Sequence, residues 1–297
     1  RGLGDVYKRQ TLTTFKADGS ILATSNGVCI STDGIAVSPW KPFIGADKAV
    51  IVDSKGQKHD VECLLGANEI YDIAKFQVSG KTAAAPLATT VSAGDEVWLT
   101  PILKSGNAEK ANVTSVEKFM DKYNYAILSS SATDKMNGVP VFDKKGQVIG
   151  LYNKSGDSQS STDANYAKEF VLKGLSQNDV TLRQSDIRIG LPNTLEEAVV
   201  ALMLSSEKPA NIHEAIVNEF ITKFPQSNDG YYALANIQIA KGEVANADKT
   251  MQTAIGKVTA KDEAHYNFAR LIYRNAFIPE FEEKAKAIGW TLDKALD

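Results

Sequence analysis

The sequence has 297 residues, of which 43% are hydrophobic and 23% are charged, and its net charge is -3. That length gives room for two ordinary domains, and that composition is typical of globular proteins and excludes a mainly disordered chain. The charge, with no Lys/Arg-rich run, excludes an electrostatic surface for nucleic acid, and no apolar run reaches the ~20 residues that span a bilayer.

The first segment, Arg1–Gln10 (RGLGDVYKRQ), shows neither the alternation of a strand nor the apolar stripe of a helix. The chain has no initiating Met, and this segment is similar to translated adaptor sequence at the ends of fragmentary reading frames. We therefore expect residues 1-10 to be a non-native or disordered lead-in. A signal peptide, a membrane anchor or a further domain upstream stays open.

Cysteine and histidine are both scarce. Cys29 and Cys63 lie in strand-like runs with nothing electropositive beside them, so we interpret them as small buried apolar residues, with a disulfide or a reactive thiol as the alternative. The histidines, His59, His213 and His265, form no metal-ligand spacing with them. We expect no metal and no cofactor, and we expect His59, in the polar run KGQKHD, to be a surface residue.

Residues 11-190 are predicted to form a β domain. Short alternating or apolar runs are separated by turn signals at Asp18-Gly19, Asp33-Gly34, Lys55-Gly56, Ala93-Gly94 and Lys145-Gly146. About a dozen strands at this spacing indicate one or two antiparallel barrels or a sandwich. The expected strands include IAVSPW, KAVIVDS, HDVECLL, IAKFQV, EVWLTPI, ANVTSVEK, NYAILSS, VPVFD and QVIGLYNK.

Two further segments of this domain are predicted to be a turn and a loop. Ser25-Asn26-Gly27 carries a turn signal inside an otherwise strand-like run. Residues 155–165 (SGDSQSSTDAN) are polar throughout, and we expect them to form the clearest loop of the domain.

The sequence pattern changes near Leu191-Pro192, where we place a domain boundary. Asn193-Thr194 followed by Glu196-Glu197 is a capping-box signature, and the residues after it have helical spacing. Residues 191-297 are therefore predicted to be an all-α domain. The expected helices are 195–206, 211–223, 229–241, 244–257, 262–275 and 279–295.

An internal repeat with a period of 34 residues marks the helical domain. Its two copies are Tyr232, Leu234, Ala235 and Asn236, and Tyr266, Phe268, Ala269 and Arg270. This period is typical of tetratricopeptide repeats, in which paired helices approach closely where side chains are small. Gln238 occupies a position where a large apolar residue is usual, so the repeat is imperfect. An unrelated antiparallel helical bundle is the alternative.

Several segments of residues 12–180 resemble trypsin-like serine proteases, particularly the bacterial high-temperature-requirement type. GVCISTDGIAVSPWKPFIGADKAVIVDSKGQKHDVECLLGANEIYDIAKFQV is similar to the first barrel of that family, and AGDEVWLTPI to the start of its second barrel. KMNGVPVFDKKGQVIGLYNK is similar to the segment around the nucleophile, which in the family contains Gly-Asn-Ser-Gly-Gly-Pro-Leu. The resemblance implies a chymotrypsin-like double β-barrel and favours a location in the cell envelope or outside the cell.

The resemblance places Lys41 at the catalytic histidine, Asp72 at the aspartate and Asn137 at the serine. A serine nucleophile needs a base with a pKa near neutrality, and the aspartate only orients that base. A lysine is charged at neutral pH unless it is strongly desolvated, and an amide is not a useful nucleophile. Lys135 also replaces the glycine of the oxyanion loop. The triad is therefore degenerate, and no intact catalytic residue is expected.

Other arrangements of these residues stay open. A Ser-Lys dyad would pair a serine of residues 129–131 with Lys41 or Lys135, although small residues are also ordinary at the end of a strand. Asp72 would act as an isolated acid or accept hydrogen bonds. We expect it to form a buried ion pair with Lys41, because a buried carboxylate needs a partner.

The two domains together predict a catalytically inactive serine-protease homologue that binds a protein or peptide. The inner helices of tetratricopeptide repeats line a concave groove, and Tyr and Arg dominate the binding energy of interfaces. Groove candidates are Tyr232, Asn236, Tyr266, Asn267, Arg270 and Arg274. Packing between repeats is the alternative role of the tyrosines, and a solvated face that of the arginines. The barrel cleft is a second candidate, by strand addition of an extended peptide.

Two rival functions stay open. One is an active trypsin-like serine endopeptidase with a non-standard site, which the fold by itself would suggest. The other is a structural spacer within a larger envelope protein. The sequence leaves the partner and the oligomeric state open.

Overall fold

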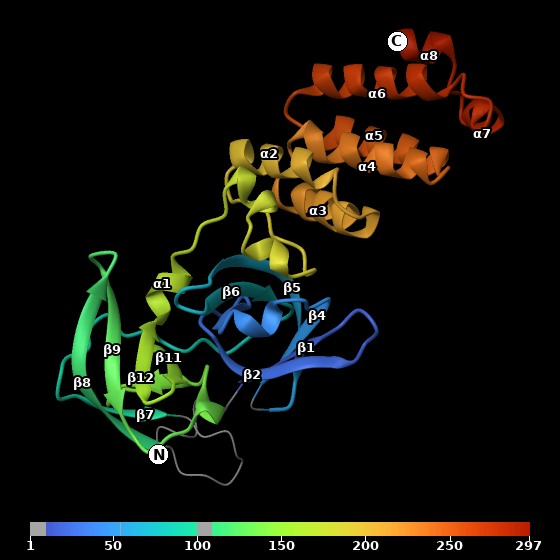
Figure 1. The fold of residues 1–297 in the computed structure, drawn as a ribbon. Helices are drawn as coiled ribbons and strands as arrows, with labels where there is room; N and C mark the ends of the chain where they lie inside the picture. Colours follow the sequence, from blue (N-terminus) through green and yellow to red (C-terminus); the bar gives the residue numbers. More distant parts are fainter. Residues whose placement is uncertain (1–9, 54, 100–108) are drawn as a thin grey trace. The chain divides into compact units, whose positions relative to one another are not determined.

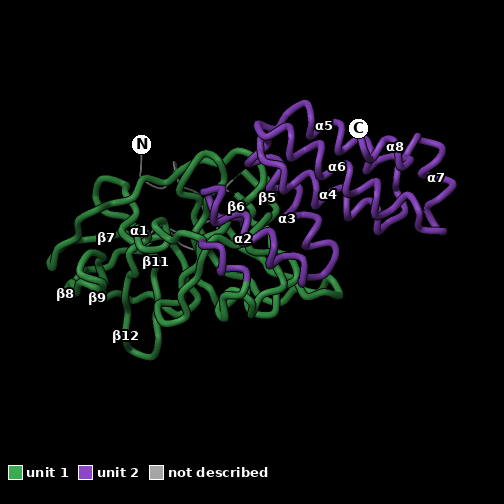
Figure 2. The backbone as a smooth tube through the Cα atoms, turned by 90° about the horizontal axis from the view of Figure 1, so that it is seen from above, with its two compact units in different colours: residues 1–172, 178–190 green, residues 173–177, 191–297 purple. Residues whose placement is uncertain are grey.

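The computed structural model describes residues 10–53, 55–99 and 109–297. The chain divides into two compact units (Figure 2): unit 1 comprises residues 1–172 and 178–190, and unit 2 comprises residues 173–177 and 191–297. Unit 1 is mainly β and unit 2 is helical (Figure 1). The predicted lead-in lies outside the described residues, except for Gln10, which is the first residue of a strand.

The first barrel is a closed antiparallel sheet of six strands in the order β1-β2-β3-β6-β5-β4. Its strands are β1 (Gln10–Phe15), β2 (Ile21–Cys29), β3 (Ile35–Ser38), β4 (Lys48–Val52), β5 (Lys58–Asn68) and β6 (Ile73–Val78). The barrel closes because β1 pairs with β2 on one side and β4 on the other; Thr13 lies opposite both Thr24 and Val50. A closed sheet leaves no strand unpaired along its whole length, although a strand can extend past the end of its neighbour.

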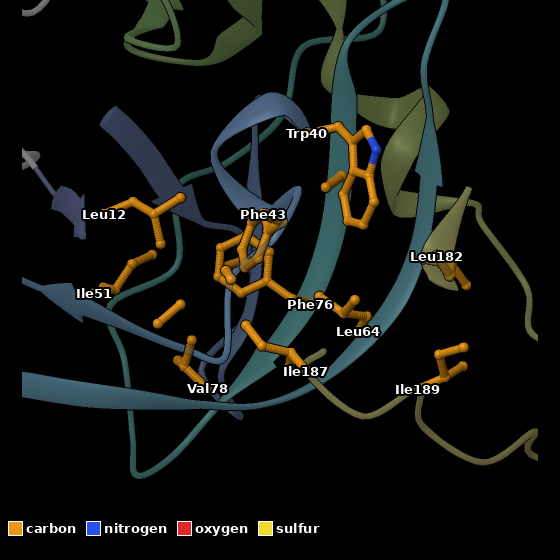
Figure 3. Close-up of a cluster of buried hydrophobic side chains, with 14 of the residues drawn as sticks. Leu12, Trp40, Phe43, Ile51, Leu64, Phe76, Val78, Leu182, Ile187 and Ile189 are labelled. Carbon is orange, nitrogen blue, oxygen red and sulfur yellow. The ribbon is translucent and has the colours of Figure 1, made fainter. Parts of the chain in front are cut away.

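Large apolar side chains fill the interior of the first barrel (Figure 3). Leu12, Trp40, Phe43 and Phe76 are each no more than 1% exposed, and the rings of Phe43 and Phe76 are 5.0 Å apart. Phe43 ends the short helix η2 (Lys41–Phe43), for which Trp40 is the N-cap. The turn that fills this core therefore also holds the backbone of Lys41.

The second barrel is also a closed antiparallel sheet of six strands, in the order β10-β11-β12-β9-β8-β7. Its strands are β7 (Glu96–Leu99), β8 (Glu109–Phe119), β9 (Tyr123–Ser129), β10 (Pro140–Phe142), β11 (Val148–Ser155) and β12 (Ser158–Asp163). The rest of the predicted strand EVWLTPI, after Leu99, lies outside the described residues. Two closed six-stranded barrels match the chymotrypsin-like double barrel that the resemblance implies.

The polar segment 155–165 is not a loop, and that prediction was wrong. Ser158–Asp163 form β12, which pairs with both β11 and β9, and Ala164–Lys168 form the short helix α1. Ser160–Asp163 are buried. Neighbouring strands satisfy the backbone of this segment on both sides, so it needs no apolar alternation to form a strand.

The turn predicted at Ser25-Asn26-Gly27 is also wrong, because these residues lie inside β2. They pair with Leu12, Thr11 and Gln10 of β1. The Gly turns predicted at the other positions are confirmed, and their glycines have φ between 78° and 91°.

Unit 2 contains the helices predicted for residues 195–275, with ends that agree to within one residue. Its helices are α2 (Leu195–Ser205), α3 (Ala210–Lys223), α4 (Asn228–Ala240), α5 (Val244–Lys257), α6 (Lys261–Asn275), α7 (Glu282–Ala287) and α8 (Leu292–Leu296). The single helix predicted for residues 279–295 is wrong. Gly289, with φ of 78°, and the buried Trp290 lie between α7 and α8.

The capping box predicted before α2 is wrong, because among the described residues neither of its two hydrogen bonds is formed. Thr194 is the N-cap, but its side chain caps no backbone group. The Glu197 carboxylate instead accepts a hydrogen bond from the backbone N–H of Gly174, which belongs to the same unit. This contact holds residues 173–177 in the helical unit, away from their neighbours in the sequence.

The imperfect repeat position at Gln238 is accommodated by a polar partner. Thr250 Oγ1 donates to Gln238 Oε1 at 2.7 Å, so a hydrogen bond joins α4 and α5 at this position. Around it, Ala235, Ala247 and Met251 belong to a buried apolar cluster with Phe268.

In the part of the chain that the structure describes, no helix has the length and apolarity to cross a membrane.

Candidate functional site

Unit 1 contains a pocket of about 720 Å³ that residues from both barrels line. Lys41, Asp72 and Asn137 all face it. The structure thus brings together the three positions that the resemblance assigned to a catalytic triad. No sequence signal pointed to the rest of the pocket wall, which includes Tyr71, Phe119, Tyr125, Asn153, Ser160 and Thr162.

The Asp72 carboxylate is held by backbone N–H groups. Its Oδ1 accepts hydrogen bonds from Trp40 N at 3.0 Å and from Lys41 N at 2.8 Å. Asp72 has φ of 49°, a left-handed conformation that Asp tolerates better than most residues. The carboxylate is therefore an acceptor that fixes the start of η2.

The predicted ion pair between Lys41 and Asp72 is wrong. Among the described residues no salt bridge joins the two side chains, and the Lys41 ammonium forms no hydrogen bond. A buried carboxylate can be satisfied by amide donors as well as by a cation. The two backbone N–H groups provide such hydrogen bonds to Asp72, so the carboxylate does not require the Lys41 ammonium. Lys41 projects from an exposed position instead.

The Asn137 side chain is bound to the backbone of β11. Its Oδ1 accepts a hydrogen bond from Lys154 N at 2.7 Å, and its Nδ2 donates to Lys154 O at 3.2 Å. Asn137 follows the short helix η3 (Asp134–Met136), and Gly138 next to it has φ of 87°. A Cβ at Gly138 would come within 2.7 Å of Pro39, so glycine is required for this loop to fit.

No side chain of the pocket can act as a neutral general base of the Ser-His type. None of its lining residues is a histidine. His59, which we expected at the surface, is 1% exposed: its Nδ1 lies 2.7 Å from Ser79 O and its Nε2 lies 3.2 Å from Asp53 Oδ2. Both ring nitrogens are thus engaged in the first barrel, and the prediction of a surface residue was wrong.

Among the described residues, no hydrogen bond joins a serine of residues 129–131 to Lys41 or to Lys135. Ser130 Oγ pairs with Gln159 Oε1 and also accepts from Ala132 N at 3.1 Å. Residues 129–131 do not line the pocket, whereas Lys41 does. Nor do the described residues contain a cluster of His, Cys, Asp and Glu that could hold a metal ion.

Aromatic rings form one wall of the pocket. The ring centroids of Tyr71 and Phe119 are 4.4 Å apart, and those of Tyr71 and Tyr125 are 6.3 Å apart. Tyr166 lies behind this wall, 5.7 Å from Tyr71 and 5.1 Å from Phe119. Tyr71 comes from a loop of the first barrel, and Phe119 and Tyr125 come from two strands of the second. Their spacing in the sequence therefore does not predict that the three rings pack together.

The sequence matches no established protein family and no curated protein. Among solved structures, the chain is similar to "HtrA-type protease AlgW with tripeptide", with 16% sequence identity and a TM-score of 0.46. A variant of AlgW with a serine replaced by alanine, also with tripeptide, gives the same identity and TM-score. The similarity covers 55% of this chain and 58% of the AlgW chain. The fold assignment accordingly stands on the two closed barrels.

Three of the groove candidates of unit 2 lie together. The Arg270 guanidinium carbon is 5.8 Å from the ring centroid of Tyr232 and 5.8 Å from that of Tyr266. Tyr266 is 62% exposed, whereas the hydroxyl of Tyr232 is buried and has no hydrogen-bond partner among the described residues. The arginine therefore lies between one packed and one exposed aromatic ring, a geometry that holds its planar head in place.

The other three groove candidates, Asn236, Asn267 and Arg274, lie outside the cation–π contacts of Tyr232, Tyr266 and Arg270. Asn236 is exposed, and its Nδ2 donates to Tyr232 O at 2.9 Å, one turn back on α4. Asn267 is half-buried and Arg274 is exposed on α6. Neither of these two side chains is in the cation–π contact that joins Tyr232, Tyr266 and Arg270.

Cys29 and Cys63 are both buried. Burial raises the pKa of the Cys29 thiol to about 11, against a smaller effect of its hydrogen bond with Thr82. A thiol with such a pKa is almost entirely protonated at neutral pH and is a poor nucleophile. This agrees with our interpretation of Cys29 as a packing residue.

Proposed function

We propose that this chain is a catalytically inactive homologue of trypsin-like serine proteases that works as a protein- or peptide-binding module. The observation that carries the proposal is the composition of the pocket. The positions of base and nucleophile hold Lys41 and Asn137, and the Asn137 amide is bonded to the backbone of Lys154. An amide in that place cannot attack a carbonyl carbon.

The loss of a triad reduces the rate by a large factor. Removal of the nucleophile or the base lowers the rate by about 10⁴–10⁶-fold and leaves only the contribution of binding and the oxyanion hole. Asp72 remains, but an aspartate in this role only orients an imidazole. A fold that keeps the cleft and lacks the reacting groups is suited to binding.

We also propose that the helices of unit 2 form a tetratricopeptide scaffold with a groove for a protein or peptide. The support is the 34-residue repeat of the sequence and the group of Tyr232, Tyr266 and Arg270 on α4 and α6. An arginine stacked on aromatic rings can still donate its N–H groups to a partner. Because the rings already restrict its rotamers, the side chain loses little conformational entropy on binding.

The inactivity is tested with the purified full chain and a fluorophosphonate probe, which labels activated serines. We expect no labelling beyond that of the heat-denatured protein. Labelling of a serine in the native chain would favour the rival function, an active endopeptidase with a non-standard site.

Binding is tested with reduced, carboxymethylated casein immobilised on a sensor surface. We expect the full chain to bind, and we expect Arg270→Ala and Tyr266→Ala each to weaken binding about 5- to 30-fold, the range of an interface residue worth 1–2 kcal/mol. Lys249→Ala, which removes an exposed cation from α5, is the matched control. Equal binding by all four proteins would remove the groove from the proposal.

A further inference from the structure

On the side of β11 that pairs with β10, the backbone hydrogen bonding continues into the residues just before β10. Tyr152 N donates to Val139 O at 2.9 Å, and Tyr152 O accepts from Gly138 N at 2.8 Å. Because backbone groups on one side of a strand recur at every second residue, Lys154 is the next position on this edge. Its N–H and C=O are bonded to the Asn137 side chain, in place of the backbone of a neighbouring strand.

A carboxamide is the chemical equivalent of a peptide group, with one carbonyl acceptor and N–H donors in a plane. At Lys154 it forms the same pair of bonds, one donated and one accepted, that an antiparallel strand would form there. We propose that the Asn137 carboxamide is an internal substitute for a bound peptide, and that an extended peptide enters the pocket by displacing it from Lys154. This inference rests on the proposed binding function and specifies how the barrel pocket takes part in it.

The pocket beside this edge has unused hydrogen-bonding groups. Ser160 and Thr162 are 3% and 4% exposed and line the pocket, and within the described part of the chain their hydroxyls form no hydrogen bond. Asn153 lies opposite Ser160 in the sheet and also faces the pocket. Polar groups at low exposure are normally satisfied, so residues of this kind in the lining of a cavity indicate a polar occupant.

The charges of the pocket favour a neutral occupant. Lys41, Lys118 and Lys154 are offset by Glu69, Asp72 and Glu117, all of which line the pocket. Such a balance gives no net attraction for a small anion or cation. A peptide backbone at Lys154, with a side chain between the ring of Tyr71 and the hydroxyl of Thr162, uses the edge, the aromatic wall and the polar groups together.

Displacement of the Asn137 carboxamide by a peptide costs free energy. The two hydrogen bonds between Asn137 and Lys154 must be broken before the backbone of Lys154 is available. The apparent affinity for a peptide is therefore about 10- to 30-fold lower than it would be if this edge were open. Removal of the carboxamide should therefore strengthen binding. A residue that itself contacts the peptide would have the opposite effect when removed.

The test uses the full chain, with Asn137→Ala and Asn137→Ser compared with the unaltered protein. Short peptides that tile the casein sequence are screened on an array, and the best is remade with fluorescein for anisotropy titration. We expect both variants to bind it about 10-fold more tightly than the unaltered chain. Asn112→Ala, at an exposed position of β8 outside the pocket, should leave the affinity unchanged.

Two further measurements use the unaltered chain, so they do not depend on whether the variants fold. They also report on the barrel pocket and not on the groove of the helical unit. In the unaltered chain, the side-chain NH₂ signals of Asn137 should shift when the peptide binds. The same peptide with its backbone N-methylated at alternate residues should lose binding, because it cannot pair with a strand edge. Equal affinities of variants and unaltered chain, unmoved Asn137 signals, or no binding by any of them overturns the inference. Loss of casein binding in Arg270→Ala reports on the groove separately.

Discussion

Asp72 combines a left-handed backbone with a carboxylate that accepts two backbone N–H groups. These bonds fix the turn that carries Trp40 into the core of the first barrel. The residue therefore has a structural role that is independent of any catalysis. Its substitution should affect folding more than binding.

We expect Asp72→Ala to lower the free energy of unfolding of unit 1 by about 3 kcal/mol, from the loss of charge-assisted hydrogen bonds and the strain of Ala at positive φ. Asp72→Asn keeps an acceptor oxygen and tolerates the same backbone, so its loss should be about 1 kcal/mol. Urea unfolding followed by Trp fluorescence measures both. Equal losses would show that the hydrogen bonds to Trp40 and Lys41 contribute nothing.

Cys29 gives a second prediction at the scale of one residue. With a pKa of about 11, roughly one thiol in a thousand is ionised at pH 8. We expect the native chain to react with a thiol-specific disulfide reagent far more slowly than the urea-unfolded chain, which exposes both thiols. Rapid reaction of Cys29 in the native protein at pH 8 would contradict its buried position.

The side-chain partners of the pocket could not be predicted from the sequence. The triad positions Lys41, Asp72 and Asn137 were found from the resemblance, because their neighbours in the sequence carry the pattern. Which groups they contact depends on the tertiary structure: Asp72 binds backbone N–H groups 31 residues or more before it, and Asn137 binds Lys154, 17 residues after it. A pattern shows which residues occupy a site, and it does not show what they are bonded to.

At the scale of secondary structure, β12 shows where reasoning from local sequence fails. Its residues, SQSSTD, have the composition of a loop and no apolar alternation. They form a strand because β9 and β11 pair with it on both sides and close the barrel. The helices of residues 195–275 were predicted well because helical spacing of apolar residues is a local signal.

The division between α7 and α8 depends on Gly289. At φ of 78°, with no neighbouring atom in the way of a Cβ, Gly289→Ala should cost about 1–2 kcal/mol through backbone strain alone. Gly256 lies within α5 with equally open space, so Gly256→Ala should stabilise the unit by up to about 1 kcal/mol. Thermal unfolding followed by far-UV circular dichroism measures both; the same sign for both would be inconsistent with this account.

The contact between α2 and α3 should make unit 2 sensitive to acid. Ser205 Oγ lies 2.8 Å from His213 Nδ1, and burial lowers the pKa of His213 below its ordinary value. The unfolded chain therefore binds this proton at higher pH than the folded chain does, and stability falls as the pH drops through about 6.5.

We expect His213→Asn to reduce the loss of stability between pH 7.5 and pH 5, measured by urea unfolding at each pH. His265→Asn, at an exposed position of α6, is the control and should leave the pH dependence unchanged. An identical pH dependence for His213→Asn and the unaltered chain would mean that this histidine is not linked to folding.

For the whole molecule, the sequence pattern placed a boundary at Leu191, and the structure begins the main part of unit 2 at the same residue. It did not predict that residues 173–177 belong to unit 2, because contacts with residues distant in the sequence hold them there: Gly174 N donates to Glu197, and Lys208 Nζ donates to Gln177 O. The double barrel and the helical unit follow from strong local patterns and a recognisable order of segments. The proposed lack of proteolytic chemistry depends on two residues within that order, Lys41 and Asn137.

The most direct test of the central claim is the incubation of the purified full chain with unfolded casein, with peptide fragments measured by mass spectrometry. We predict no fragments above those produced by a heat-denatured sample of the same preparation. Turnover of casein that is abolished by one substitution in the pocket, such as Asp72→Asn, would contradict the account.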